Sequence, residues 1–259
     1  MTITCENLGR SFQGVSAVSN VSFQMEAGHS MAIIGPNGAG KSTTLGMLTT
    51  ILKPDQGSAQ ICGFDIATQA RDVRRHIGVL FQDATLDDVM TPLETLEFHA
   101  VLHGLARKGL KDRIAAALNW AGLESVATMP VRGFSGGMKR RLELARSMLH
   151  QPALLILDEP TLGLDPQGRI DLWARISKLK AHGMAVLLTT HVLAEAESCT
   201  RIGILHKGEL IALDTQENLI KELGTSVNAT LEDVFLSLTD RSLQHHAPSL
   251  RPALVRTRA

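Results

Sequence analysis

The sequence predicts an α/β fold with a mainly parallel sheet, a peripheral antiparallel β subdomain and an inserted helical subdomain. Three observations indicate this architecture. Short apolar runs typical of buried strands alternate with helical stretches. A glycine-rich turn separates one such strand from the helix that follows it. Between residues 83 and 150, helical periodicity replaces the strand pattern, which indicates an insertion made of helices.

The composition is that of an ordinary globular protein of 259 residues, 44% hydrophobic and 20% charged. Lys and Arg (26) balance Asp and Glu (26), so the formal net charge is 0 and we expect no nucleic-acid partner. The three cysteines, Cys5, Cys62 and Cys199, are widely spaced, which favours reduced thiols in a cytosolic protein. We find neither a secretory signal pattern nor an apolar run of about 18 to 20 residues. If the function involves a membrane, we therefore expect another chain to cross it.

In the first part of the chain, residues 3–8 and 21–25 alternate in polarity around Gly14 and predict a small antiparallel sheet. Residues 31–34 form a short apolar run that predicts a buried strand. After the glycine-rich turn, residues 42–52 have helical periodicity. Together they predict a strand, a loop and a helix in that order.

Further strands are predicted at residues 77–81, 153–157 and 185–189. The last two flank a predicted helix at 167–182, whose inward side chains we expect to be Leu172, Trp173, Ile176 and Leu179. Parallel strands joined by such a helix account for the main sheet. The inserted subdomain is predicted to contain helices at 93–105, 111–121 and 139–150.

Towards the end of the chain, residues 202–206 and 209–213 predict a hairpin through Lys207-Gly208, followed by two short helices. The second helix has one apolar face, made by Leu231, Val234, Phe235 and Leu238. We expect residues 1–241 to form a single domain and 242–259 to be a disordered tail. Within the domain, the expected parts are the core (1–82 and 151–215), the helical subdomain (83–150) and the C-terminal helices (216–241).

The glycine-rich turn matches the pattern GxxxxGK[ST] of phosphate-binding loops, in the required place between a strand and a helix. Its glycines let backbone amides surround phosphate groups at the positive end of the helix dipole. Lys41 is expected to reach the β- and γ-phosphates, and Ser42 to bind Mg²⁺. A glycine-rich turn without a ligand is the alternative. The predicted nucleotide-binding residues of the loop are Gly35, Pro36, Asn37, Gly38, Ala39, Gly40, Lys41, Ser42 and Thr43.

Two carboxylates, Asp158 and Glu159, end the apolar run that starts at Leu154. Successive residues of a strand point to opposite faces, so we expect one carboxylate to reach Mg²⁺ and the other a water molecule. We assign Asp158 to the metal and Glu159 to the catalytic base. An acidic pair after a strand is otherwise typical of a helix N-cap or a solvated turn.

The order of these motifs resembles the ATP-binding cassette (ABC) family over residues 3–239. The most specific match is Phe134-Ser135-Gly136-Gly137-Met138, which resembles the family signature LSGGQ. This resemblance implies that Ser135, Gly136 and Gly137 bind the nucleotide held by a second chain. Met138 takes the place of the usual Gln, which affects only a side-chain contact. In isolation, the same residues would be a serine-capped helix start.

Other positions match the family one by one. Gln82 resembles the glutamine that contacts Mg²⁺ and the reacting water, and His191 resembles the switch histidine at the γ-phosphate. Gly163-Leu164-Asp165 resembles the loop that passes between subunits. We interpret the other nine histidines, His245 and His246 included, as surface or packing residues.

Phe12 takes the position of the family's adenine-stacking aromatic residue, often Tyr, a residue type that this chain lacks. An aromatic face is sufficient for stacking. Without a hydrogen-bonding group there, we expect weak discrimination between ATP and GTP. The alternative for Phe12 is an ordinary core position.

The ending Ala229-Thr230-Leu231-Glu232-Asp233-Val234-Phe235-Leu236 resembles ABC ATPases that serve ABC-2 type export permeases, as do residues 89–98. The resemblance implies an ATPase that hydrolyses ATP with Mg²⁺, as a homodimer or with a second ATPase subunit. It implies peripheral attachment to an integral membrane permease on the cytoplasmic face of the membrane. A soluble ABC ATPase in cofactor assembly or another role without transport is the alternative, and a P-loop kinase would not explain the signature.

Overall fold

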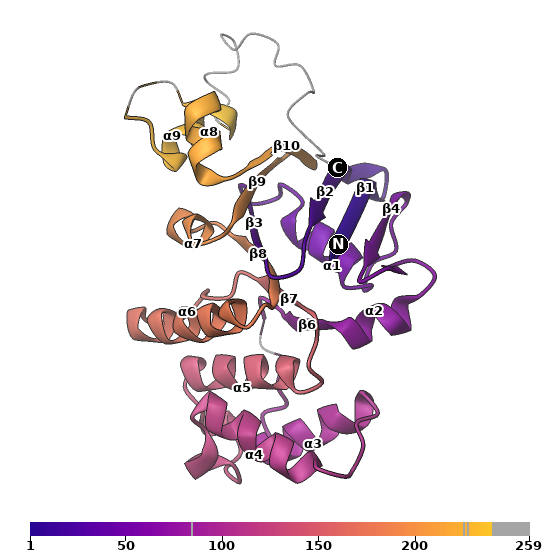
Figure 1. The fold of residues 1–259 in the computed structure, drawn as a ribbon, viewed down its shortest axis with the longest axis vertical. Coiled ribbons are helices and arrows are strands. Elements are labelled where there is room, and N and C mark those ends of the chain that lie inside the picture. Colours follow the sequence, from indigo (N-terminus) through magenta and orange to yellow (C-terminus); the bar gives the residue numbers. More distant parts are fainter. Residues whose placement is uncertain (84, 225, 227, 240–259) are drawn as a thin grey trace.

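The structure is a computed structural model, which describes residues 1–239 except 84, 225 and 227 (Figure 1). The predicted disorder of residues 242–259 lies outside the described residues. Among those described, no helix combines the length and the apolar character that crossing a lipid bilayer requires.

Ten strands form one sheet in the order β5-β4-β1-β2-β10-β9-β3-β8-β7-β6. The strands are β1 (Ile3–Phe12), β2 (Val15–Met25), β3 (Ser30–Ile34), β4 (Gln56–Ile61), β5 (Phe64–Asp65), β6 (Ile77–Leu80), β7 (Leu154–Asp158), β8 (Ala185–Thr190), β9 (Arg201–His206) and β10 (Glu209–Asp214). Strands β9, β3, β8, β7 and β6 pair in parallel. Strands β5, β4, β1 and β2 pair antiparallel. Strand β10 joins the two parts, because it pairs antiparallel with β9 and shares one parallel register pair, Glu209 with Asn20, with β2.

The helices fall into groups that Figure 1 separates clearly, with α3, α4 and α5 at one end of the molecule and α8 and α9 at the other. The helices are α1 (Lys41–Leu48), α2 (Ala70–His76), α3 (Pro92–Leu102), α4 (Leu110–Ala121), α5 (Gly136–Met148), α6 (Pro166–Ala181), α7 (Leu193–Glu197), α8 (Gln216–Leu223) and α9 (Leu231–Thr239). Short 3₁₀ turns at Glu124–Val126 and Val131–Gly133 lie between α4 and α5.

The central strands are buried on both faces, as their nearly continuous apolar runs require. In β7, Leu154 and Ile156 belong to one apolar cluster, whereas Leu155 and Leu157 belong to another on the opposite face. A third cluster, which includes Leu96 of α3, forms within the helices at residues 83–150. The domain boundaries stated above remain a prediction.

The strands of the parallel core, the final hairpin and the helices of the insertion are confirmed, with small shifts of their ends. The structure adds β4, β5, α2 and α7, which the sequence pattern did not predict. Strand β4 carries glutamine and serine along its exposed face, and β5 has only two residues, so both lack a continuous apolar pattern.

Three predicted helix ends are wrong by three residues or more, and one of them is the end expected at residue 105, which lies at Leu102. The helix expected to reach residue 52 ends at Leu48, because Thr49 donates its hydroxyl to the Leu45 carbonyl and Thr50 adopts a left-handed φ of 63°. Helix α5 begins at Gly136 and not at residue 139. Ser135 caps it by accepting a hydrogen bond from the Met138 amide at 3.3 Å.

Candidate active site

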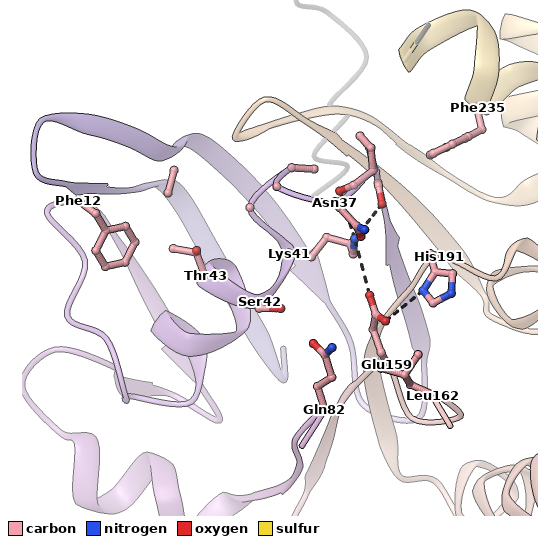
Figure 2. Close-up of a pocket in the computed structure, with 16 residues that line it drawn as sticks. Phe12, Asn37, Lys41, Ser42, Thr43, Gln82, Glu159, Leu162, His191 and Phe235 are labelled. Atoms are coloured by element: carbon pink, nitrogen blue, oxygen red, sulfur yellow. Dashed lines mark hydrogen bonds and ion pairs between the residues drawn. The ribbon is translucent and has the colours of Figure 1, made fainter. Parts of the chain in front are cut away.

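A cavity of about 850 Å³ lies where β3, β6, β7 and β8 end, at the edge of the parallel sheet that commonly holds ligands (Figure 2). It is lined by Phe12, Ala17, Gly35, Pro36, Asn37, Gly38, Ala39, Gly40, Lys41, Ser42, Thr43, Gln82, Glu159, Leu162, His191 and Phe235. The cavity thus brings together the whole predicted phosphate loop, Phe12, Gln82, Glu159 and His191. Asp158 is not one of these lining residues and lies beside Ser42.

The loop from Gly35 to Ser42 has a backbone that requires glycine. Gly38 and Gly40 have φ values of 78° and 104°, and a Cβ atom at Gly40 would lie 2.6 Å from the Ala17 carbonyl oxygen. Gly40 is the N-cap of α1 and provides no side-chain hydrogen bond. The amides of the first turn of α1 are therefore left for an anion in the cavity.

Lys41 lies at the base of the cavity and is 6% exposed. Its ammonium donates to the Gly35 carbonyl at 2.8 Å and the Pro36 carbonyl at 3.3 Å. Burial lowers the pKa of Lys41, and the nearby carboxylates of Glu159 and Asp158 partly offset this effect. The loop thus holds a cationic group directly under the space for phosphates.

Ser42 and Asp158 form a set of oxygen donors. The Ser42 hydroxyl lies 3.5 Å from Asp158 Oδ1, which also accepts a short hydrogen bond from the Thr189 hydroxyl. Hard oxygen donors that meet beside a phosphate loop fit Mg²⁺. The structure therefore brings together two of the three predicted metal ligands. Gln82, the third, reaches into the cavity from the end of β6 (Figure 2).

Glu159 is held by two cationic or hydrogen-bonding partners. Its Oε2 lies 3.0 Å from His191 Nδ1, and its Oε1 lies 3.9 Å from Lys41 Nζ. The two carboxylates have different partners, as expected, but alternation along one strand is not the reason. Strand β7 ends at Asp158, and Glu159 has a left-handed φ of 44° that turns its side chain into the cavity.

Arg140 of α5 is a site residue that the sequence analysis did not single out. Its buried guanidinium donates to the carbonyls of Phe81 (2.5 Å), Asp158 (3.4 Å), Glu159 (3.3 Å) and Pro160 (2.8 Å). It also pairs with Glu143 at 3.2 Å. Arg140 therefore ties α5 to the two segments that carry Gln82 and Glu159. In the sequence it stands in a run of basic residues, which is typical of a solvated helix face.

Glu195 of α7 is a second missed residue and is 6% exposed. It accepts hydrogen bonds from the hydroxyls of Thr161 and Thr190, the latter at 2.5 Å. One carboxylate thus fixes the segment after Glu159 and the residue before His191. Phe235 of α9 and Leu162 also line the cavity, and the sequence pattern assigned neither of them to the site.

Ser135, Gly136 and Gly137 lie outside the residues that line the cavity. They form the start of α5, where Ser135 and Gly136 are exposed. Within one chain, the structure does not bring this signature to the phosphate loop.

Phe12 is 42% exposed at the rim of the cavity, with the Arg10 guanidinium 5.2 Å from its ring centroid. A half-exposed ring at the end of β1 is available for stacking against a base, and the alternative of a core position is wrong.

We expect Phe12→Ala to weaken ATP and GTP binding alike, by about 1–3 kcal/mol, because base stacking does not depend on hydrogen-bond readout. Equilibrium binding of fluorescent ATP and GTP analogues measures the effect. Val15→Ala, an exposed apolar exchange on β2, is the control. Loss of ATP affinity with GTP affinity preserved would mean that another residue recognises adenine.

The chain is similar in sequence to known ATP-binding proteins of transporters. Residues 18–162 match the family described as ABC transporter. The Linearmycin resistance ATP-binding protein LnrL of Bacillus subtilis (strain 168) is 36% identical over 94% of this chain and 80% of its own length. The Nod factor export ATP-binding protein I of Ralstonia nicotianae is 40% identical over 87% of this chain and 71% of its own length.

Solved structures give the same result for the fold. A structure described as the ATP binding subunit of an ABC transporter has a TM-score of 0.84 and 31% identity, over 92% of this chain and 99% of that chain. A dimeric ATP-binding cassette, MJ0796, bound to ADP and Pi in a post-hydrolysis state, has a TM-score of 0.75 and 26% identity, over 82% and 98% of the two chains. The α/β fold predicted from the sequence is confirmed, and so is the resemblance to the family.

Proposed function

The chain belongs to the ABC transporter family, and from this premise we propose that it is the ATP-binding and ATP-hydrolysing subunit of a membrane exporter. The observation that carries the ATPase proposal is the position of Glu159, which lies between Lys41 and His191 over the phosphate loop. A carboxylate, an ammonium and an imidazole around one space provide a base, a phosphate ligand and a hydrogen-bonding group.

The phosphates of ATP would lie on the amides at the start of α1, with Lys41 beneath the β- and γ-phosphates. The adenine ring would stack on Phe12. Ser42 and Asp158 would hold Mg²⁺, with Gln82 next to them. When bound there, Mg²⁺ would neutralise negative charge that develops on the phosphates during hydrolysis.

Glu159 is the group we assign to the attacking water. Its carboxylate accepts a proton from the water as the oxygen approaches the γ-phosphate. His191 holds Glu159 Oε2 at 3.0 Å and faces the same space, where it can donate to a γ-phosphate oxygen. Arg140 and Glu195 act as positioning residues, because they fix the backbone on either side of Glu159 and His191.

A second chain would complete each site. The exposed start of α5 presents the Ser135 hydroxyl and free amides to the outside, which suits an anion carried by another molecule. We infer a dimer in which each ATP lies between the Lys41 loop of one chain and the Ser135 segment of the other. The second chain is an identical copy or another ATPase subunit.

Three features support the exporter assignment over a soluble role in cofactor assembly. Two relatives carry names that refer to export or resistance. The sequence ending at α9 resembles ABC ATPases of ABC-2 type permeases. Helix α3 and the turn before it expose apolar side chains that suit a protein partner: Val89 (72%), Phe98 (55%), Val101 (74%) and Leu102 (67%). We therefore place the chain at the cytoplasmic face of the membrane, bound to an integral permease.

Purification from native membranes tests this assignment. We expect the tagged chain in mild detergent to retain a multi-span membrane protein, and Phe98→Asp to lose at least about 90% of it, because a charge would be buried in an apolar contact. The readout is mass spectrometry of the retained proteins together with ATP binding by the isolated chain.

Ile211→Asp is the matched control, since it places the same charge on an exposed apolar position of β10. Wild-type chain that retains only soluble proteins would contradict the exporter assignment and favour the soluble role. Equal retention by Phe98→Asp and wild type would contradict the α3 contact alone.

A further inference from the structure

Three histidines from two separate segments form a cluster in the helical part of the molecule. His99 lies in the last turn of α3, His103 is the C-cap of that helix four residues later, and His150 follows α5. The ring centroids of His103 and His150 are 3.9 Å apart, and those of His99 and His103 are 4.3 Å apart. One ring nitrogen of each histidine lies within 4.8 Å of one ring nitrogen of each of the others.

Two ring nitrogens in this cluster are buried and have no hydrogen-bond partner among the described residues, namely His99 Nε2 and His150 Nδ1. The other nitrogen of His150, Nε2, lies 2.9 Å from the Ile77 carbonyl oxygen. A carbonyl only accepts, so Nε2 carries the proton and Nδ1 presents a lone pair. A metal-binding histidine typically has this arrangement, in which one nitrogen is free and the other donates to a backbone carbonyl.

We propose that His99, His103 and His150 bind one divalent transition-metal ion of the Zn²⁺ class. The ligand atoms would be His99 Nε2, His150 Nδ1 and one nitrogen of His103. Three histidines leave a fourth tetrahedral position for a water molecule. The ion would join α3 to the segment that connects α5 with β7, so it would act as a clamp within the helical part.

The geometry allows this after rotation of the side chains. Tetrahedral coordination with Zn–N distances of about 2.0–2.1 Å requires ligand nitrogens about 3.4 Å apart. The present separations of up to 4.8 Å exceed this by little more than 1 Å. Histidines at positions i and i+4 of a helix present their rings to one metal ion, as in known zinc-binding helices.

The electrostatic environment favours neutral rings. Burial, followed by the neighbouring His103 and His150, lowers the pKa of His99 to about 3, and burial likewise lowers the pKa of His150 to about 4. Arg146 also faces His99, but its guanidinium donates to the Thr85 carbonyl at 3.1 Å and lies near Glu143. Neutral imidazoles without a carboxylate favour Zn²⁺, Ni²⁺ or Cu²⁺ over Mg²⁺ or Ca²⁺.

The test uses the full chain, freed of metal and without nucleotide, titrated with Zn²⁺ against a coloured chelator. We expect one Zn²⁺ per wild-type chain, and an affinity about 100-fold lower for His99→Gln and for His103→Gln. Two controls retain the wild-type affinity. His29→Gln removes an exposed histidine elsewhere, and the double variant His245→Gln/His246→Gln removes the adjacent pair near the end of the chain.

Thermal unfolding separates metal binding from packing. In EDTA, His103→Gln should unfold close to the wild-type temperature, whereas Zn²⁺ at 100 times its Kd should raise only the wild-type midpoint, by about 5–10 °C. Substitution with Co²⁺ in the wild-type chain gives a check that needs no variant. Visible absorption bands without a thiolate charge-transfer band support histidine ligation.

Three results would overturn the proposal. One is unchanged Zn²⁺ affinity in His103→Gln. Another is loss of the bound ion in the His245→Gln/His246→Gln variant. The third is a thiolate band with Co²⁺, which would place the metal on Cys62, the half-exposed cysteine.

Discussion

Replacement of Glu159 by Gln is expected to lower the rate of ATP hydrolysis by about 10²–10⁴-fold while ATP remains bound. Glutamine keeps the size of the side chain and can still hydrogen-bond to His191, which lies 3.0 Å from the carboxylate. It cannot accept a proton from the attacking water. The variant should therefore stop after ATP binding and accumulate as a dimer that encloses two nucleotides.

Phosphate release and gel filtration in ATP and Mg²⁺ measure the two parts of this prediction. Asp158→Asn is the matched control, because it makes the same carboxylate-to-amide change one residue earlier, at the group beside Ser42. Asp158→Asn should weaken the Mg²⁺-dependent part of ATP binding itself. Hydrolysis by Glu159→Gln at the wild-type rate, or a monomer that binds ATP, would contradict the role assigned to Glu159.

The sequence was sufficient to predict those site residues that belong to a continuous motif or stand at the end of an apolar strand. The phosphate loop is continuous along the chain, and its glycines are required locally, since Gly38 and Gly40 adopt left-handed φ values. Asp158 ends one apolar strand and His191 follows another, and parallel strands end at one edge of the sheet. The spacing and the topology together bring these residues to one edge of the sheet, where the phosphate loop and His191 line the cavity and Asp158 lies beside Ser42.

Residues that act through contacts distant in sequence could not be predicted in this way. Arg140 donates hydrogen bonds to the carbonyls of Phe81 and Glu159, and no residue next to Arg140 in the chain indicates those partners. Glu195 joins Thr161 to Thr190 and resembles any other acidic residue of a short helix. The turn at Glu159 also depends on tertiary structure, because its amide donates to the Thr189 carbonyl of β8 at 3.0 Å.

The cluster of three histidines also depends on a contact between segments that are distant in sequence. His99 and His103 share a helix face, which a sequence pattern can indicate, but His150 reaches them only because α5 packs on α3. The interpretation of these histidines as ordinary packing residues depended on sequence neighbours alone. Packing brings the third ring to the other two and leaves two of the cluster's nitrogens buried, with no hydrogen-bond partner in the described part of the chain.

Replacement of Lys41 by Ala is expected to lower ATP affinity by about 100-fold, or about 3 kcal/mol, because hydrogen bonds from a charged donor to the β- and γ-phosphates are lost. The exchange also removes the donor to the Gly35 and Pro36 carbonyls and the cation beside Glu159. Equilibrium binding of ATP measures the loss. Lys53→Ala, at an exposed lysine outside the cavity, should retain wild-type affinity.

The same variant tests whether each site needs two chains. A Lys41→Ala chain keeps Ser135, and a Ser135→Ala chain keeps Lys41, so their heterodimer contains one intact site and one site with both defects. Random pairing of equal amounts makes half of the dimers mixed, and we expect about a quarter of the wild-type hydrolysis rate if the sites act independently. Each variant alone should be nearly inactive. Activity of the mixture no higher than the mean of the two separate variants would mean that Ser135 does not act on the nucleotide bound by the Lys41 loop of another chain. In that case the exposed serine and glycines at the start of α5 would be no more than a helix cap.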